Sequence, residues 1–282
     1  MVTTGGAMNA VRQVEANGVR LSVAVAGNGP ALVLLHGFPH TWQLWSKVIS
    51  TLAERYRVLA PDLRGLGASS RPESGFDAGT VAADVAGLLD ALGEPDADVV
   101  AIDLAVSSAL LLALRQPERV RRLVLMESLP WGFPASAPWW FGFHAVPGLG
   151  ETVLNGHEAE YVGWFLEQGT LGRGAPADVQ AAFAEAYTGT DALRCAFEYY
   201  RAMPESARQL TEAATKRLIV PTMAVGANPV GDALEQQLRP IADDLTGHVL
   251  ADCGHLIPLD RPREFLDLLL PFLSREILAG CR

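Results

Sequence analysis

A single acid in an apolar run limits most strongly what this chain can fold into. Residues 99–105 are apolar except for Asp103, and a helix-like segment begins at Ser107. Such a run before a helix is typical of an inner strand of a parallel sheet, where an acid is unexpected. A sharp strand-to-helix turn explains the acid: it needs small residues two positions away, here Ala101 and Ala105, and it directs the central side chain into the cleft above the sheet. The alternative is that Asp103 only caps the helix.

The segments around this turn alternate between strand-like and helix-like patterns. The pattern predicts an N-terminal hairpin followed by strands separated by helices, which indicates an α/β fold with a mostly parallel sheet covered on both faces. The predicted strands are residues 11–15, 19–25, 31–35, 58–60, 99–102, 122–126, 218–225 and 248–251, and the predicted helices are residues 42–54, 81–92, 107–114, 232–243 and 262–278.

Residues 129–217 interrupt this alternation. The segment is rich in proline and aromatic residues and shows helix-like runs without a convincing strand. We therefore expect a helical cap over residues 129–217, inserted after the sixth strand of a core formed by residues 1–128 and 218–282.

Composition excludes several classes of partner. The 282 residues are 49% hydrophobic, enough to bury a full core, and 32 acids against 22 bases give a net charge of −10, which argues against nucleic acid or an anionic membrane as partner. The N-terminus has no basic leader and no segment reaches the length of a membrane span, so we expect a cytoplasmic protein. The three cysteines, Cys195, Cys253 and Cys281, lack metal-binding spacing and are expected to be free thiols.

Three residues with catalytic chemistry follow predicted strands. Asp103, Glu127 and His255 each lie just beyond the carboxyl end of a strand. Open parallel sheets bind their ligands at this edge. We therefore expect the three side chains to meet in one site.

Four motifs together resemble the α/β-hydrolase superfamily, and within it the epoxide hydrolase family. They are the segment His36-Gly37-Phe38-Pro39, the loop at residues 62–69, the turn centred on Asp103, and Gly254-His255. The likeness extends from about residue 19 to residue 273. Glu127 matches a bacterial branch that carries its triad acid after the strand following the elbow helix. The chain also resembles tailoring epoxide hydrolases of aromatic polyketide pathways.

This resemblance implies a role for each residue. Asp103 is the nucleophile, His255 activates water, and Glu127 orients His255. The backbone N–H groups of Phe38 and Leu104 form the oxyanion hole. Asp232 is the reserve candidate for the triad acid, although the position where many relatives place the acid reads Gly226-Ala227-Asn228-Pro229.

The resemblance also extends to the predicted cap. The segment at residues 197–202 matches one whose tyrosine before arginine holds the epoxide oxygen, which here is Tyr200. The usual Trp-His pair reads Trp139-Trp140, so the indole N–H of Trp140 would replace the histidine as a donor. We expect Trp139, Trp140, Tyr200 and Phe38 to contact an apolar, aromatic epoxide. Neither a cofactor nor a metal is expected, and a monomer and a homodimer are both compatible with the sequence.

Departures from the family leave two alternative functions open. The elbow reads Ala101-Ile102-Asp103-Leu104-Ala105, where relatives have Gly-His-Asp-x-Gly. A haloalkane dehalogenase-type hydrolase shares the aspartate but places a halide-binding tryptophan where this chain has Leu104. A non-hydrolytic ligand-binding protein on the same fold is the second alternative. A serine esterase is disfavoured, because it would need serine in the elbow and Ser107 lies four residues into the helix.

Overall fold

The computed structural model describes residues 8–133 and 137–275, and these residues form an eight-stranded sheet in the order β1-β2-β4-β3-β5-β6-β7-β8. The first two pairs in this order are antiparallel and the others are parallel, which confirms the predicted fold class. The strands are β1 (Met8–Ala16), β2 (Val19–Ala26), β3 (Ala31–Leu35), β4 (Arg57–Pro61), β5 (Ala97–Ile102), β6 (Val120–Met126), β7 (Thr222–Gly226) and β8 (Leu245–Val249).

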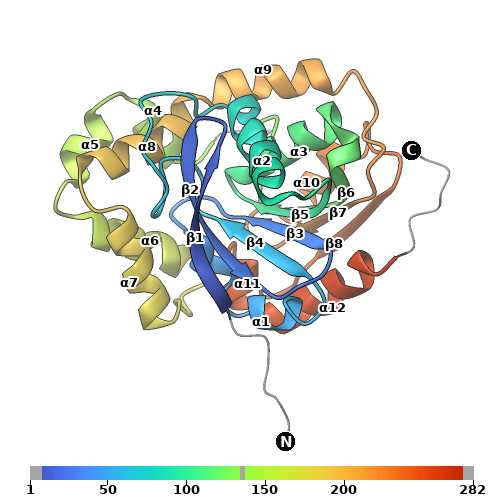
Figure 1. Ribbon diagram of the computed structural model, residues 1–282. Coiled ribbons are helices and arrows are strands. Elements are labelled where there is room, and N and C mark those ends of the chain that lie inside the picture. The colour runs from blue at the N-terminus through green and yellow to red at the C-terminus, as the bar shows by residue number, and fades with distance from the viewer. Residues whose placement is uncertain (1–7, 134–136, 276–282) are drawn as a thin grey trace, which may run out of the picture.

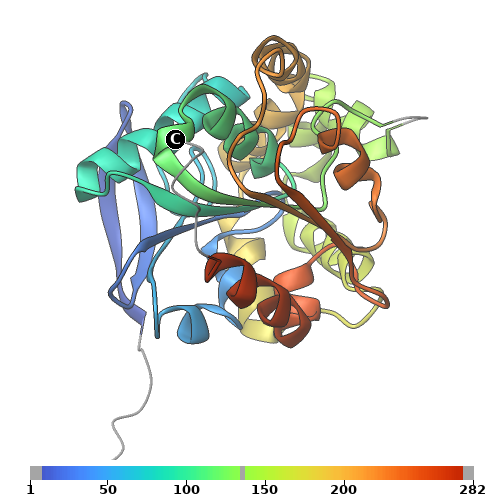
Figure 2. The same ribbon diagram turned by 90° about the vertical axis from the view of Figure 1, so that its right-hand side faces the viewer.

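Helices cover both faces of this sheet. On one face lie α2 (Ala78–Leu92), α3 (Ala105–Arg115) and α10 (Ala233–Leu238), and on the other lie α1 (Ile49–Leu52), α11 (Ile257–Asp260) and α12 (Pro262–Leu273) (Figures 1 and 2). Because β3 and β5 are covered on both faces, every residue in them is buried, and this explains their nearly continuous apolar sequence. None of the described helices is long and apolar enough to cross a membrane.

A second group of helices comes from the insertion between β6 and β7. It comprises α4 (Trp139–Ala145), α5 (Leu149–Leu154), α6 (Glu158–Gly169), α7 (Ala177–Ala186), α8 (Thr190–Arg201) and α9 (Met203–Ala213). Helices α4 to α8 gather at one side of the sheet (Figure 1). Helix α9 instead returns to the core, where Ala78 N–H donates to Ser206 Oγ at 2.9 Å and Gly79 N–H donates to Gln209 Oε1 at 2.7 Å. The range predicted for the cap, residues 129–217, thus includes a last helix, α9, that packs against the core.

Several predicted element bounds are wrong for identifiable reasons. The helix predicted at 42–54 is a short 3₁₀ helix, η1 (Trp42–Trp45), followed by α1. The strand predicted at 218–225 begins only at Thr222, because Pro221 has no N–H to donate to a sheet. The strand predicted at 248–251 lies at Leu245–Val249, at a partly exposed sheet edge.

Two predicted helices are also too long. The helix predicted at 232–243 ends at Leu238, shortly before Pro240. The last helix ends at Leu273, and the part of its prediction at 276–278 lies outside the described residues. A further 3₁₀ helix, η2 (Pro117–Arg119), connects α3 to β6.

Candidate active site

Asp103 occupies the strained turn that the sequence indicates. It follows β5 directly, has a φ of 57°, and its carbonyl accepts Val106 N–H at 3.1 Å as α3 begins. A non-glycine residue in this left-handed region stores on the order of 1–3 kcal/mol. The turn also needs Gly37 opposite it, because a Cβ there would lie 2.1 Å from Asp103 Oδ1. Ala101 and Ala105, the small residues that the sequence indicates on either side of this turn, are both fully buried.

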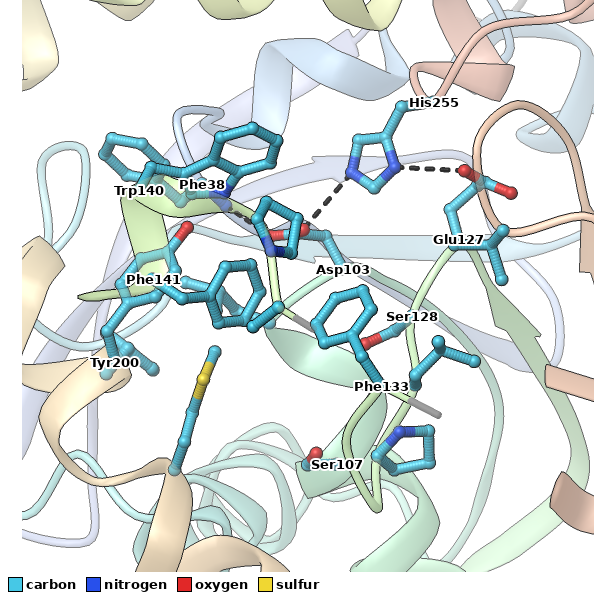
Figure 3. Close-up of a pocket in the computed structure, with 18 of the residues that line it drawn as sticks. Phe38, Asp103, Ser107, Glu127, Ser128, Phe133, Trp140, Phe141, Tyr200 and His255 are labelled. Atoms are coloured by element: carbon cyan, nitrogen blue, oxygen red, sulfur yellow. Dashed lines mark hydrogen bonds and ion pairs between the residues drawn. The ribbon is translucent and has the colours of Figure 1, made fainter. Parts of the chain in front are cut away.

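The structure brings together the three residues found at strand ends. His255 Nε2 lies 3.2 Å from Asp103 Oδ2, and His255 Nδ1 lies 3.1 Å from Glu127 Oε2 (Figure 3). Glu127 is 1% exposed, and its second oxygen accepts Ala227 N–H at 2.5 Å. The reserve acid, Asp232, accepts a hydrogen bond from the neighbouring helix residue Gln236 on the surface. Among the described residues, only Glu127 holds His255 Nδ1.

Two carboxylates set the charge state of His255. Burial favours the neutral ring, but the hydrogen bonds and charges of Asp103 and Glu127 outweigh burial and raise the pKa of His255 to about 10. Burial opposes ionisation of Asp103 as well, yet the hydrogen bond and charge of His255 and the N–H of Phe38 lower the pKa of Asp103. The resting site is therefore an imidazolium between two carboxylates.

One of the two expected oxyanion donors already contacts the carboxylate. Phe38 N–H donates to Asp103 Oδ1 at 2.9 Å. Leu104 stands at the start of α3, where backbone N–H groups have no partner within the helix, and it makes no hydrogen bond to Asp103 in the described structure. The Phe38 ring packs edge-on against Tyr200, with centroids 5.9 Å apart.

Tyr200 differs from two other buried tyrosines in what its hydroxyl does. Tyr187 donates to the carbonyl of His40 at 2.7 Å, and Tyr199 donates to the carbonyl of Arg64 at 2.9 Å. Tyr200 has no hydrogen-bond partner within the described chain and lines the cavity above Asp103. Burial raises its pKa well above 10, so the phenol remains a donor.

The tryptophan pair begins α4 and forms the wall beside Tyr200. Trp140 packs edge-on against Phe165, with ring centroids 5.5 Å apart, and Figure 3 shows it with Tyr200 on the cap side of Asp103. Trp139 packs against Trp140 at 5.9 Å and remains 59% exposed. Both line the cavity, as the sequence predicts for substrate-contacting residues.

One histidine that the sequence interpretation treats as structural supports this wall. His144, one helical turn after Trp140, is fully buried and lies with its Nε2 2.7 Å from Tyr161 Oη. Its ring stacks on Phe197 at 4.2 Å and meets Tyr200 edge-on at 4.3 Å. Burial lowers the pKa of His144 to about 3, so it packs as a neutral ring.

The cavity around these residues is large and mostly apolar, with a volume of about 830 Å³. Besides the expected residues it includes Ser107 and Ser128, which the sequence interpretation did not assign to the site. Ser107 lies one helical turn beyond Asp103, and Ser128 directly follows Glu127. Their spacing from these two predicted site residues is the sequence feature that could have identified them. No cluster of histidine, cysteine or acidic side chains in residues 8–133 and 137–275 has the arrangement of a metal site.

Comparisons with known proteins agree with the fold and identify similar proteins. A family model described as the alpha/beta hydrolase fold matches residues 30–160. The chain is 30% identical to the soluble epoxide hydrolase of Corynebacterium sp. strain C12 over 278 residues, which cover 93% of this chain and 96% of that one. Cfl2 from Burkholderia cenocepacia has a similar structure, with a TM-score of 0.87, 33% identity, and coverage of 95% and 96%. The epoxide hydrolase CorEH has a TM-score of 0.88 at 29% identity, with coverage of 94% and 98%.

Proposed function

The chain belongs to the α/β-hydrolase superfamily, within its epoxide hydrolase family, and we propose that it hydrolyses an apolar, aromatic epoxide to a vicinal diol, in the biosynthesis of an aromatic polyketide. One observation carries this proposal. The Asp103 carboxylate lies between His255 and the N–H of Phe38, below a Tyr200 hydroxyl that has no partner among the described residues. A carboxylate nucleophile in the same cavity as an unpaired phenol, which stays protonated and can donate, suits the opening of a strained ether.

In the first step, Asp103 Oδ2 attacks an epoxide carbon and the carbon–oxygen bond breaks, which forms an ester. The leaving oxygen takes the proton of Tyr200, while the indole N–H of Trp140 donates a hydrogen bond to it. The resulting tyrosinate recovers a proton from the His255 imidazolium through solvent. His255 can release this proton because esterification removes the negative charge of Asp103, which lowers the pKa of His255.

In the second step, neutral His255 takes a proton from a water molecule that attacks the ester carbonyl. The N–H groups of Phe38 and Leu104 stabilise the developing oxyanion, a contribution of about 3–4 kcal/mol per donor in comparable sites. The ester collapses, the alkoxide takes a proton from His255, and the diol leaves. The acid proton of Asp103 then returns to His255, which restores the resting imidazolium between two carboxylates.

The aromatic character of the substrate is inferred from the cavity wall. Trp139, Trp140 and Phe141 face the cavity from α4, and Tyr200 faces it from α8. Aromatic rings bind planar apolar ligands by stacking and edge contacts. A dehalogenase would need donors for a halide; the side chains of Phe38 and Leu104 supply none, which leaves the indole N–H groups of Trp139 and Trp140 as the donors for it.

Product analysis tests the proposal against the dehalogenase alternative. The purified protein is offered styrene-type epoxides, polycyclic aromatic epoxides and haloalkanes of matched size. We expect diol from the epoxides, fastest with the polycyclic ones, and no halide release. Halide release without diol would establish the dehalogenase, and binding of the epoxides without any turnover would establish the ligand-binding protein.

A further inference from the structure

Three serines line the cavity, and two of them, Ser107 and Ser128, lie on the side of Asp103 away from Trp140 (Figure 3). Ile102 pairs with Met126, so Asp103 and Glu127 leave the sheet side by side. Ser128 follows Glu127, and Ser107 and Ser108 lie in the first turns of α3. In Figure 3, Ser128 and Ser107 lie below Asp103, while Trp140 and Tyr200 lie above and beside it. The cavity thus has one end formed by Trp140 and Tyr200 and another end at which serine hydroxyls lie beside Phe133.

These hydroxyls have no partner in the described chain, whereas several other hydroxyls in or next to helices have one. A serine or threonine in or just after a helix can donate to the carbonyl four residues back. Six described residues of this chain do so, namely Thr152, Thr170, Thr188, Ser206, Thr211 and Ser274. Ser107, Ser108 and Ser128 form no hydrogen bond with any described residue, although Ser108 is only 2% exposed.

A fourth serine in the cavity wall makes the contrast sharper. Ser206 accepts Ala78 N–H at 2.9 Å and donates to the Ala202 carbonyl at 3.1 Å, so its hydroxyl connects α9 to α2. The hydroxyl of Ser206, which has a structural role, thus makes two hydrogen bonds within the protein, whereas the other three hydroxyls make none. Ser107 and Ser128 are only half-buried and open onto the cavity, so a ligand atom can pair with their hydroxyls without breaking a bond within the fold.

We propose that Ser107, Ser108 and Ser128 form a subsite for a carbonyl or hydroxyl oxygen that the substrate carries away from its epoxide. This inference rests on the proposed function and makes the substrate an oxygenated polycyclic epoxide, not a hydrocarbon epoxide. A serine hydroxyl donates to a carbonyl oxygen and either donates to or accepts from a hydroxyl, so the two oxygen types share one chemistry.

The size and polarity of the cavity agree with such a substrate. Its volume of about 830 Å³ is in the range of sites for drug-sized ligands, far larger than a styrene-type epoxide needs. In mostly apolar sites of this kind, a few polar groups fix the orientation of the ligand. Here, Tyr200 would hold the epoxide oxygen and the serines a second oxygen, with Asp103 between them.

Stability measurements separate this role from a structural one. Replacing Ser107 or Ser128 with alanine removes no hydrogen bond between described residues, so we expect an unchanged or higher melting temperature. Ser206→Ala is the matched control from the same wall, and it should lower the melting temperature because two hydrogen bonds are lost. A melting temperature that falls as far in Ser128→Ala as in Ser206→Ala would assign Ser128 to the fold and overturn the proposal for it.

Ligand binding tests the subsite directly. The Asp103→Ala protein, which cannot form the ester, is titrated by calorimetry with two matched pairs: fluorene and 9-fluorenone, and phenanthrene and 9-phenanthrol. We expect each oxygenated ligand to bind about tenfold tighter than its hydrocarbon. Adding Ser107→Ala or Ser128→Ala should reduce this preference at least threefold and leave hydrocarbon binding unchanged, whereas Ser206→Ala should leave the preference intact.

Two results would overturn the subsite. Equal affinities for the ketone, the phenol and their hydrocarbons would show that the serines bind only water. In that case the ligand oxygen would displace water without any gain in binding free energy, because it would form no better hydrogen bonds than the water did. A preference that survives the Ser107→Ala and Ser128→Ala double change would place the second oxygen elsewhere. Failure of the proposed function is separate: the unmodified protein would then form no diol, while the binding preference would persist.

Discussion

On the sheet side of the cavity the reacting groups are held by hydrogen bonds, whereas on the cap side they are held by ring packing. Asp103 and Glu127 each use both carboxylate oxygens, one on His255 and one on a backbone N–H. Tyr200 and Trp140 are fixed by neighbouring rings, and their polar atoms have no partner in the described chain.

This difference follows from what each side has to do. A buried charge is stable only when it is paired and hydrogen-bonded, so the charged groups need their partners before substrate arrives. The donors on the cap side act on an oxygen that only the substrate brings, so a partner within the protein would compete with it. The comparison predicts that changes on the sheet side stop a chemical step, whereas changes on the cap side slow ring opening by degrees.

The largest expected effect comes from the nucleophile. Asp103→Ala should reduce diol formation by at least about 10⁴-fold, because no other carboxylate is placed to form the ester. Alanine adopts the left-handed conformation of this turn less readily than aspartate, so the variant should lose some stability but keep its fold. Circular dichroism checks the fold and product analysis checks the activity. Near-normal diol formation by a folded variant would remove Asp103 from the mechanism.

The second effect separates the two chemical steps on the sheet side. His255→Gln keeps Asp103 able to attack but removes the base that activates water. Intact-protein mass spectrometry should then show a gain equal to the mass of the epoxide, with about one equivalent bound. The unmodified protein, treated in the same way, should show no lasting gain. If no adduct accumulates in His255→Gln, the histidine does not act as the base for ester hydrolysis.

How much of this arrangement the sequence predicts depends on the side of the site. Asp103 and Glu127 directly follow the strands β5 and β6, which are so apolar that their carboxyl ends are clear from the sequence, whereas His255 lies in the loop after β8. The edge strand β8 is polar and half-exposed, and its predicted position was wrong. Local patterns identify the buried interior of a parallel sheet better than its edge.

The cap side was less predictable for another reason. Tyr187, Tyr199 and Tyr200 are all buried tyrosines, and only the three-dimensional contacts show which hydroxyl is free. The same holds for Ser107 and Ser206, which both line the cavity but differ in whether the hydroxyl is already bonded. A residue type does not reveal whether its polar atom is already satisfied within the fold.

A smaller effect is expected from the cap donors. Trp140→Phe keeps a ring and most of the packing but removes the indole N–H, so ring opening should slow by roughly ten- to a hundredfold. Tyr200→Phe should cost more, because it removes the phenol that gives its proton to the leaving oxygen in the proposed mechanism. Single-turnover kinetics of ester formation measures both, with diol binding as the control. Weaker diol binding with an unchanged alkylation rate in Trp140→Phe would make Trp140 a wall of the cavity and not a donor.

The smallest expected effect concerns the charge of His255, and it tests the hydrogen-bonded side of the comparison directly. Asp103→Asn preserves the shape of the side chain, and asparagine also tolerates the left-handed conformation of the turn. The change removes one of the two negative charges beside the His255 ring. The pKa of His255, about 10 in the resting protein, should therefore fall. Glu127→Gln should lower it as well, through the second carboxylate. Titration of the histidine Cε1 signal by NMR measures the shift.

Stability should follow the same pKa. Because the folded pKa of His255 lies above its unfolded value of about 6.5, the pairing stabilises the protein fully below that unfolded value and loses its contribution as pH rises through about 10. Each unit by which Asp103→Asn lowers the folded pKa removes about 1.4 kcal/mol of this contribution at low pH. Melting temperatures of the two proteins should accordingly differ most at pH 6 to 7 and approach each other near pH 10 to 11. A difference that stays constant over this range would show that Asp103 stabilises the fold by some means other than the charge of His255.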